Sequence, residues 1–345
     1  MDTKTYVGLD TKNLRIWWLR IRAAPGAPDL YGVLYMFDNP PKEEDHQRMI
    51  KSFIARLTKP HRLQRVREKI WSYFFFKQWI LLIAKEVQNE SASWNNFTPL
   101  MPPSDRLWAD PFVWKHEGNY YIFCEERLYS SNRGHIACLT LDNQMNPIAN
   151  SVVLERPYHL SYPFIFEYQE QIYMIPETEK NRTVELYRCT CFPNHWVFVK
   201  TLLTNIKAVD ATLLETNGKW WLFTNIREGG TNWDALHLFY ADDPLSNQWI
   251  PHPRNPIVKD IRSARPAGRI FSYDGEFIRP SQDCSVRYGY AINFSRIAVL
   301  TDSDYEEICE WSLKPPAYRN IYGTHTWNEA GGLTTIDALI RRTKY

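Results

Sequence analysis

The sequence predicts an all-β fold: a five-bladed β-propeller with an N-terminal α/β extension that helps to close the ring. Five segments of similar pattern recur about every 50 residues along the second part of the chain, as in repeat architectures. Their apolar positions follow a period of two rather than 3.6, which favours strands over helices. Aromatic residues, which strands accommodate well, make up 15% of the 345 residues.

Each of the five segments has the pattern of a β-hairpin, in which an apolar run, a polar turn and an aromatic-rich run follow one another. The segments begin at Asp110, Tyr162, Asp210, Ala267 and Thr324. The turn carries Gly118, Gly218, Gly275 or Gly332 in four of them and Glu170 in the second. Further strand-like runs bring each unit to about four strands, the size of a propeller blade.

Few residues follow the fifth hairpin, so we expect strands from the N-terminal region to complete that blade. The runs 14–21 and 77–87 have the required pattern, and closure of the ring would remove the open strand edges. We therefore divide the chain into an N-terminal extension, 1–105, and a propeller, 106–345. Residues 48–70 are basic and amphipathic, which predicts a helix that either lies on an anionic membrane or packs on the propeller.

Composition excludes several classes of protein. The charge is nearly balanced, with 41 basic and 39 acidic residues, which argues against nucleic-acid binding. Six cysteines show no metal or redox spacing and favour a reducing compartment. The first residues form no apolar leader, and the longest apolar run, 73–84, is too short to span a bilayer. We expect a cytoplasmic protein, peripheral to a membrane if 48–70 bind lipid.

The repeat brings polar side chains together at one mouth of the expected central channel. The first strand of each hairpin would start at this mouth, and the second would return to it. Asp110, Tyr162 and Asp210 occupy the first position, and His325 follows Thr324 in the fifth segment. Fifteen residues later stand Glu125, Glu177, Asn225 and Gln282, followed in two blades by Glu126 and Asp283. His159, Arg265, Arg269 and Arg279 flank these hairpins.

Carboxyl groups that share a site repel one another's charge, so their pKa values separate and one can keep a proton. Cleavage of a glycosidic bond needs such an acid together with a base or nucleophile. The candidate catalytic residues are Asp110, Asp210, Glu125, Glu177 and Asp283. The candidate substrate-binding residues are His159, Tyr162, Arg265, Arg269, Arg279, Gln282 and His325. Turns, strand caps and ion pairs are the structural alternatives for these residues.

No cofactor is expected, because no loop has the spacing of a calcium motif. A metal ion in the central channel is left as an open alternative. Expected partners are a carbohydrate, nucleotide-sugar or glycolipid substrate, and no nucleic acid.

The propeller pattern and the Ala109-Asp110-Pro111 start resemble glycoside hydrolase family 43. The resemblance implies that Asp110 is the catalytic base and that Asp210 tunes pKa values and positions the sugar. The general acid of that family is a Glu near the start of the fourth blade. Here that place reads SARPAGR, 263–269, without a carboxylate, which argues against ordinary hydrolysis.

A closer resemblance is to the glycosidase-like N-terminal domain of plant glucosamine inositolphosphorylceramide transferases and its stand-alone bacterial relatives. It covers about residues 105–340 and rests on six strings in order: LWADPF (107–112), HLSYPFIFE (159–167), AVDATL (208–213), SARPAGR (263–269), RPSQDC (279–284) and GTHTWN (323–328). In the plant proteins a separate transferase domain follows, so that activity does not carry over to this chain.

Three hypotheses follow. The first is glycosyl transfer from a phosphate-activated sugar in the biosynthesis of a surface glycan or glycolipid, with the arginines holding phosphate. The second is hydrolysis of furanoside-type sugars, with Asp110 as base and Glu125, Glu177 or Asp283 as a displaced acid. The third is a glycan-binding propeller without catalysis.

Overall fold

The computed structural model describes residues 75–85, 93–227, 231–316 and 320–343 in full, and the backbone of three strands before them. The chain divides into two compact units, Met1–Phe74 and Phe75–Tyr345. In the first unit, β1 (Tyr6–Thr11), β2 (Leu14–Ile21) and β3 (Leu30–Val33) form an antiparallel sheet. The basic helix expected at 48–70 lies outside the described residues, as does any membrane contact through it.

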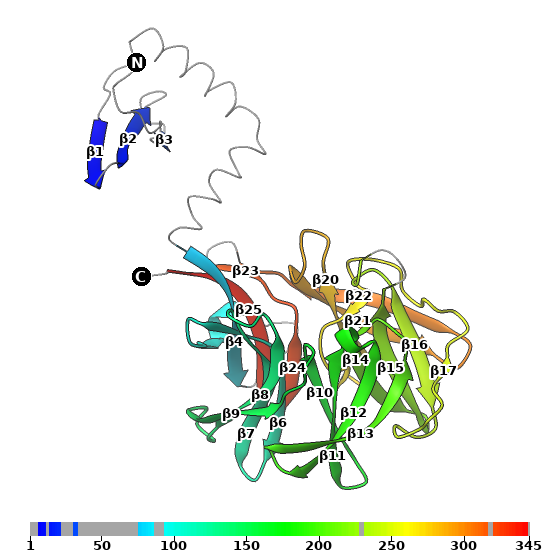
Figure 1. Cartoon of the computed structure of the whole chain (residues 1–345). Helices are drawn as coiled ribbons and strands as arrows, with labels where there is room; N and C mark the ends of the chain where they lie inside the picture. The colour runs from blue at the N-terminus through cyan, green and yellow to red at the C-terminus, as the bar shows by residue number, and fades with distance from the viewer. Residues whose placement is uncertain are drawn as a thin grey trace. The chain divides into compact units, whose positions relative to one another are not determined.

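The second unit is a five-bladed β-propeller, as the repeat predicts (Figure 1). The first three blades are made of consecutive strands: β6 (Arg106–His116), β7 (Asn119–Leu128), β8 (Gly134–Leu141) and β9 (Pro147–Leu154); β10 (Ser161–Tyr168), β11 (Gln171–Thr178), β12 (Thr183–Cys191) and β13 (His195–Thr204); β14 (Ala208–Thr216), β15 (Lys219–Ile226), β16 (Leu236–Ala241) and β17 (Ile250–Pro251).

In the last two blades the first strand is split. The fourth blade contains β18 (Arg265–Pro266), β19 (Phe271–Tyr273), β20 (Glu276–Asp283), β21 (Ala291–Leu300) and β22 (Tyr305–Leu313). The fifth contains β23 (Ile321–Gly323), β24 (Trp327–Ala330), β25 (Leu333–Thr343), β4 (Phe75–Lys85) and β5 (Thr98–Leu100). Helical structure in the fully described segments consists of two 3₁₀ turns, η2 (Trp94–Asn96) and η3 (Glu179–Asn181), and no helix there is long and apolar enough to cross a bilayer.

The hairpin turns confirm the role expected of the glycines. Gly118, Gly218, Gly275 and Gly332 have φ angles of 83°, 70°, 81° and 79°, a region that a residue without a Cβ enters freely. Glu170 takes the equivalent place in the second blade with φ 58°. The shared left-handed turn explains why one position recurs in every repeat.

The fifth blade takes its last two strands from before the first blade. β4 pairs antiparallel with β25 along its whole length, from Phe75 opposite Thr343 to Lys85 opposite Leu333. This pairing uses the run expected at 77–87 and protects an edge that β25 would otherwise expose. Residues 14–21 form a strand as expected, β2, but the expected role in closing the ring was wrong, because β2 pairs with β1 and β3 instead.

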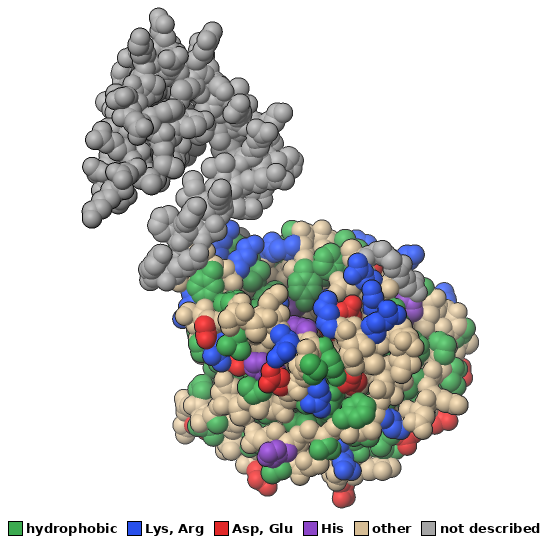
Figure 2. All heavy atoms as spheres, viewed as in Figure 1, with side chains coloured by type: hydrophobic (Ala, Val, Ile, Leu, Met, Phe, Trp, Pro, Cys, Tyr) green, Lys and Arg blue, Asp and Glu red, His purple; other side chains and the backbone are tan. Residues whose placement is uncertain are grey.

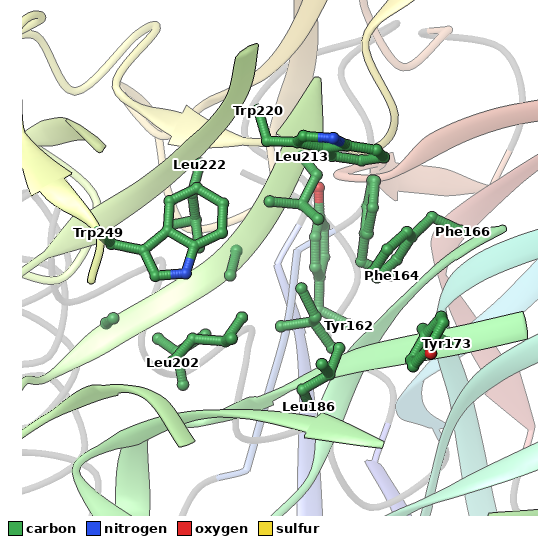
Figure 3. Packing of buried hydrophobic residues seen from close by; sticks show 14 of the residues in the cluster. Tyr162, Phe164, Phe166, Tyr173, Leu186, Leu202, Leu213, Trp220, Leu222 and Trp249 are labelled. Atoms are coloured by element: carbon green, nitrogen blue, oxygen red, sulfur yellow. The ribbon is translucent and has the colours of Figure 1, made fainter. Parts of the chain in front are cut away.

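The hydrophobic core lies between neighbouring blades, where side chains of facing sheets interdigitate. Figure 3 shows the largest such cluster, in which Phe164 and Phe166 of β10 lie close to Trp220 of β15. The ring centroids of Phe166 and Trp220 are 5.7 Å apart. Each buried aromatic or aliphatic side chain stabilises the fold by about 1.5–3 kcal/mol, so this packing fixes the spacing of the strand ends that carry the candidate site.

Candidate active site

The first strands of the first three blades share a β-bulge at their starts. Asp110, Tyr162 and Asp210 have φ angles of 51°, 43° and 55°, and the ladder of hydrogen bonds shifts register at each of them. A left-handed backbone at a residue other than glycine costs about 1–3 kcal/mol and is found preferentially at functional sites. The repeat therefore predicted three equivalent positions, and each has the same unusual backbone.

Asp110 belongs to a buried network with His325 and Asp337. Thr326 Oγ1 donates a 2.8 Å hydrogen bond to Asp110 Oδ1, and His325 Nε2 lies 3.6 Å from the same oxygen. On the other side of the ring, His325 Nδ1 is 2.5 Å from Asp337 Oδ2. Asp337 also accepts hydrogen bonds from the backbone N–H groups of Asp110, His325 and Thr326. Asp337 thereby fixes both the backbone of Asp110 and the ring of His325.

The charges of this network follow from its burial. Burial raises the pKa of Asp110 to about 6, while the neighbouring His325 acts in the opposite direction. Burial alone would lower the pKa of His325, but the carboxylates of Asp337 and Asp110 raise it to about 9. At neutral pH, Asp110 is therefore mostly ionised beside an imidazolium.

Glu125 lies at the end of β7 next to His159. The backbone N–H of Gly134 donates a 2.8 Å hydrogen bond to His159 Nδ1, so the ring proton is on Nε2. His159 Nε2 lies 3.5 Å from Glu125 Oε1. Burial, with Asp110 as the next contribution, raises the pKa of Glu125 to about 8, and burial lowers the pKa of His159 to about 4. A neutral histidine thus faces a carboxyl group that keeps its proton at neutral pH.

Glu126, the next residue, faces the other side of β7 because successive side chains of a strand alternate. It accepts hydrogen bonds from Trp108 Nε1 at 2.8 Å and Arg106 Nη1 at 3.2 Å, and it contacts His135 Nε2 at 3.0 Å. Burial alone would raise its pKa, but the bonds from His135 and Trp108 hold the pKa of Glu126 at about 2. Glu126 is therefore a structural carboxylate.

The third carboxylate group is centred on Asp210 and Arg265. Arg265 donates to Asp210 Oδ2 through Nε at 2.5 Å and to Oδ1 through Nη2 at 3.3 Å, and its Nη2 is 3.6 Å from Glu177 Oε2. Gln282 Nε2 donates a 3.1 Å hydrogen bond to Asp210. Burial, and then Asp210, raises the pKa of Glu177 well above its ordinary value. One guanidinium is thus shared by the carboxyl groups of Asp210 and Glu177.

The structure gives four of the predicted site residues other contacts. The Tyr162 hydroxyl is buried between Thr212 Oγ1 and the backbone N–H of Gly268, each at 2.8 Å. Arg279 forms a bidentate ion pair with Glu307, at 2.7 and 2.6 Å. Asp283 lies on the face of β20 opposite Gln282, where its carboxylate accepts the backbone N–H of Ser285 at 2.9 Å.

Arg269 is the fourth of these residues. It donates to the carbonyl of Ile165 and lies over the Phe164 ring at 5.0 Å. Burial lowers its pKa to about 10. These contacts hold its guanidinium beside β10, without a carboxylate partner among the described residues.

Asp110, His325 and Asp337 are also the group that comes closest to a metal site, with ligand atoms within 4.8 Å of one another. The fit is poor, however. Both oxygens of Asp337 already face N–H groups, which occupies the approximately four lone-pair directions of a carboxylate. His325 also holds a proton in this arrangement, whereas a metal-bound imidazole must be neutral at the ligating nitrogen.

Sequence reasoning missed Asp337 and the aromatic side chains near His325. Asp337 stands in an otherwise apolar stretch of β25, TTIDALI, and an isolated carboxylate there was the available signal. Trp79 of β4 stacks on His325 with ring centroids 4.2 Å apart, and Tyr288 meets the same ring edge-on at 5.3 Å. Both aromatic residues come from segments outside the repeated hairpins.

On the face shown in Figure 2, acidic, basic and histidine side chains are intermingled on the described unit. This agrees with the nearly balanced charge of the chain.

Residues 84–334 match the family described as "Glucosamine inositolphosphorylceramide transferase 1, N-terminal". Two curated relatives carry the name glucosamine inositolphosphorylceramide transferase 1. The one from Oryza sativa subsp. japonica is 36% identical over 58% of this chain and 27% of its own length. The one from Arabidopsis thaliana is 34% identical over 70% of this chain and 32% of its own length. The chain thus spans about a third or less of the relatives it matches.

Among solved structures, the catalytic domain of the Coprinopsis cinerea GH62 α-L-arabinofuranosidase is similar, with a TM-score of 0.51. The two chains are 11% identical, and the match covers 77% of this chain and 98% of the other. At this identity the similarity concerns the fold alone.

Proposed function

The chain belongs to the glucosamine inositolphosphorylceramide transferase 1 N-terminal family, and from this premise we propose that its propeller carries out acid–base chemistry at a glycosidic bond. The observation that carries the proposal is the pair of buried carboxyl groups at one end of the first blade, where Asp110 stands at the bulge of β6 and Glu125 of β7 lies opposite Ala109. Burial raises the pKa of Glu125 to about 8 and that of Asp110 to about 6. Around pH 7 one is an acid and the other a base, which is the pair that such a reaction needs.

In this proposal Glu125 protonates the leaving oxygen, and His159 donates to the resulting carboxylate through Nε2. Asp110 acts as a base towards an incoming water or hydroxyl, or as a nucleophile, while His325 and Thr326 hold its carboxylate. Glu177 and Asp210 bind sugar hydroxyls, and Arg265 balances their charge. Glu125 of the first blade would thus take the role of general acid, which glycoside hydrolase family 43 gives to a Glu of the fourth blade that this chain lacks.

The experiment is an assay of release from 4-nitrophenyl glycosides, among them the α-L-arabinofuranoside, β-D-xyloside and N-acetylglucosaminide, with and without an alcohol acceptor. Turnover by the wild type should fall at least a hundredfold in Asp110→Asn and Glu125→Gln, the usual scale for general acid–base groups. Glu126→Gln is the matched control and should retain turnover. Saccharide binding without turnover of any substrate would favour a glycan-binding propeller instead.

A second candidate is glycosyl transfer from a phosphate-activated sugar, which the printed name of the relatives favours. The described contacts weigh against it, because Arg265 and Arg279 already hold carboxylates and Arg269 holds a carbonyl. A thermal-shift screen with UDP-sugars and sugar phosphates tests this candidate. A stabilising shift that disappears in Arg265→Ala would favour transfer, since only a ligand bound to the native state raises the melting temperature.

A further inference from the structure

Four aromatic rings contact one another in a row beside the carboxylates, and we call this group the aromatic corner: Trp79, His325, Tyr288 and Trp233. Trp79 and His325 are stacked, with centroids 4.2 Å apart and planes at 22°. Trp233 and Tyr288 form a second stacked pair at 6.0 Å and 30°. The Tyr288 ring stands at 82° to His325, so the two pairs meet nearly at a right angle. The rings come from β4, the start of the fifth blade and two loops, and no repeat brings them together.

The aromatic corner adjoins both halves of the candidate active site. His325 lies 3.6 Å from Asp110, and the guanidinium of Arg265, which holds Asp210, lies 5.0 Å from the Tyr288 centroid. His325 is buried, whereas Trp79, Tyr288 and Trp233 keep part of their surface exposed. A ligand in contact with those three rings would therefore have its reacting bond beside the carboxylates.

Close backbone packing keeps the corner in place. A Cβ on Gly289, whose φ is 62°, would lie 3.0 Å from Trp79 Cη2 and 3.2 Å from the Cβ of His325. A Cβ on Gly323 would lie 2.2 Å from the carbonyl oxygen of Gly289. The two glycines allow the loop that carries Tyr288 to approach Trp79 directly, so the rings are preorganised for a ligand.

Two kinds of ligand commonly stack on aromatic rings, nucleobases and sugar rings. The charged groups around the aromatic corner decide between them. Five carboxyl groups, Asp110, Asp210, Glu125, Glu177 and Asp337, lie beside three cations, Arg127, Arg265 and His325, and each of these cations already faces a carboxyl oxygen. A nucleoside diphosphate brings negative charge into this surrounding and is disfavoured. A neutral sugar brings none, its C–H face suits the negative face of an aromatic ring, and its hydroxyls suit carboxylates.

We propose that the aromatic corner is a stacking subsite for a neutral sugar ring, next to the bond on which the carboxylates act. The proposal rests on the proposed function for its orientation towards that bond. Trp233 is the residue that should determine affinity, because it is partly exposed and stacks on Tyr288, which in turn contacts His325.

The test measures binding, not turnover, with the full chain and three probes: cellotriose, 1,5-α-L-arabinotriose and uridine diphosphate. Titration calorimetry and saturation-transfer NMR should show binding of a trisaccharide. Trp233→Ala should weaken it about tenfold, the loss expected for one aromatic contact, and Trp233→Phe should restore most of it. Phe198→Ala, which truncates an exposed aromatic residue on the outer strand β13, is the control and should bind as the wild type does.

Three results would overturn the proposal: no trisaccharide binds, a trisaccharide binds equally well to Trp233→Ala, or uridine diphosphate binds through Trp233 in place of the sugars. Failure of the proposed function looks different. A trisaccharide that binds through Trp233 while no glycoside is turned over keeps the subsite and removes the acid–base assignment. If instead a glycoside is turned over and Trp233→Ala binds the trisaccharide as well as the wild type does, the acid–base assignment stays and the subsite is removed.

Discussion

The carboxyl groups of Glu125 and Glu126 leave β7 on opposite faces and meet opposite electrostatic surroundings. Glu125 Oε1 faces His159 Nε2 at 3.5 Å, whereas Glu126 Oε2 accepts a 2.8 Å hydrogen bond from Trp108. Burial raises the pKa of Glu125 to about 8, and hydrogen bonds, against the effect of burial, hold the pKa of Glu126 at about 2. We therefore predict that replacing these two adjacent glutamates by glutamine changes the stability of the protein in opposite directions.

Replacement of Glu125 by Gln should stabilise the protein, and increasingly so at higher pH. The folded pKa of Glu125 lies above its unfolded value of about 4.5, so the folded state holds the extra proton and the wild type loses stability as pH rises from about 4.5 to 8. Gln imitates the protonated group and avoids that loss. Thermal unfolding should show equal melting temperatures near pH 4.5 and a higher one for Glu125→Gln at pH 8.

Glu126→Gln is the matched control and should behave in the opposite way. The folded pKa of Glu126 is depressed, so its contribution, on the order of 3 kcal/mol, is present above pH 4.5 and is lost as pH falls towards 2. The variant should unfold at lower denaturant concentration at pH 7. Equal destabilisation by the two substitutions at pH 8 would mean that Glu125 is an ordinary ion-paired carboxylate.

The activity of the wild type should have a bell-shaped dependence on pH. The base Asp110 ionises with a pKa of about 6 and the acid Glu125 loses its proton with a pKa of about 8, so kcat/KM should rise through pH 6 and fall through pH 8. A substrate with a 2,4-dinitrophenolate leaving group needs no acid. With that substrate Glu125→Gln should keep its activity and lose the alkaline limb. An alkaline limb that persists in Glu125→Gln would assign it to another group.

The register of the repeat made the first half of the site predictable. An offset of fifteen residues from Asp110 and Tyr162 identified Glu125 and Glu177, because the hairpins have equivalent geometry. The same offset from Thr324 gives Leu339, whereas the carboxylate of the fifth blade is Asp337. The register itself is the same, since Leu339 pairs with Gly323 as Glu125 pairs with Ala109, but the carboxylate of the fifth blade stands two residues earlier in β25. The fifteen-residue offset therefore did not identify Asp337, the residue that orients Asp110.

The three arginines show what a sequence pattern cannot supply. Their clustering in the fourth blade suggested a phosphate site, but partners from other strands decide what a guanidinium binds. Arg279 pairs with Glu307 of β22, and Arg265 pairs with Asp210 of another blade. Neither partner is near its arginine in the sequence: the first pairing needs the folded fourth blade, and the second needs two blades side by side.

Tyr162 should contribute to stability rather than to binding. Its hydroxyl joins three blades through Thr212 Oγ1 and the N–H of Gly268, and the side chain is fully buried. Tyr162→Phe leaves the Gly268 N–H without its partner and removes one of the two hydrogen bonds of Thr212 Oγ1, so it should lower the free energy of unfolding by about 2 kcal/mol, measured by urea denaturation. Tyr168→Phe, which removes a hydroxyl that donates to Asp243 at the rim, should cost less. A large loss of saccharide affinity with unchanged stability would restore Tyr162 to the binding residues.

Asp337 should prove to be a positioning residue whose loss changes both stability and the response to pH. The folded pKa of His325 is about 9 against 6.5 unfolded, so its ion pair with Asp337 contributes fully below pH 6.5 and is lost as pH rises to about 9. Asp337→Asn leaves a buried imidazolium with one carboxylate fewer and should cost about 3–5 kcal/mol near pH 6. Denaturation at pH 6 and pH 9 checks this, because the difference in the free energy of unfolding between the wild type and Asp337→Asn should be smaller at pH 9 than at pH 6. A gap for Asp337→Asn that stays constant with pH would mean that Asp337 acts through its backbone hydrogen bonds alone, without the charge of His325.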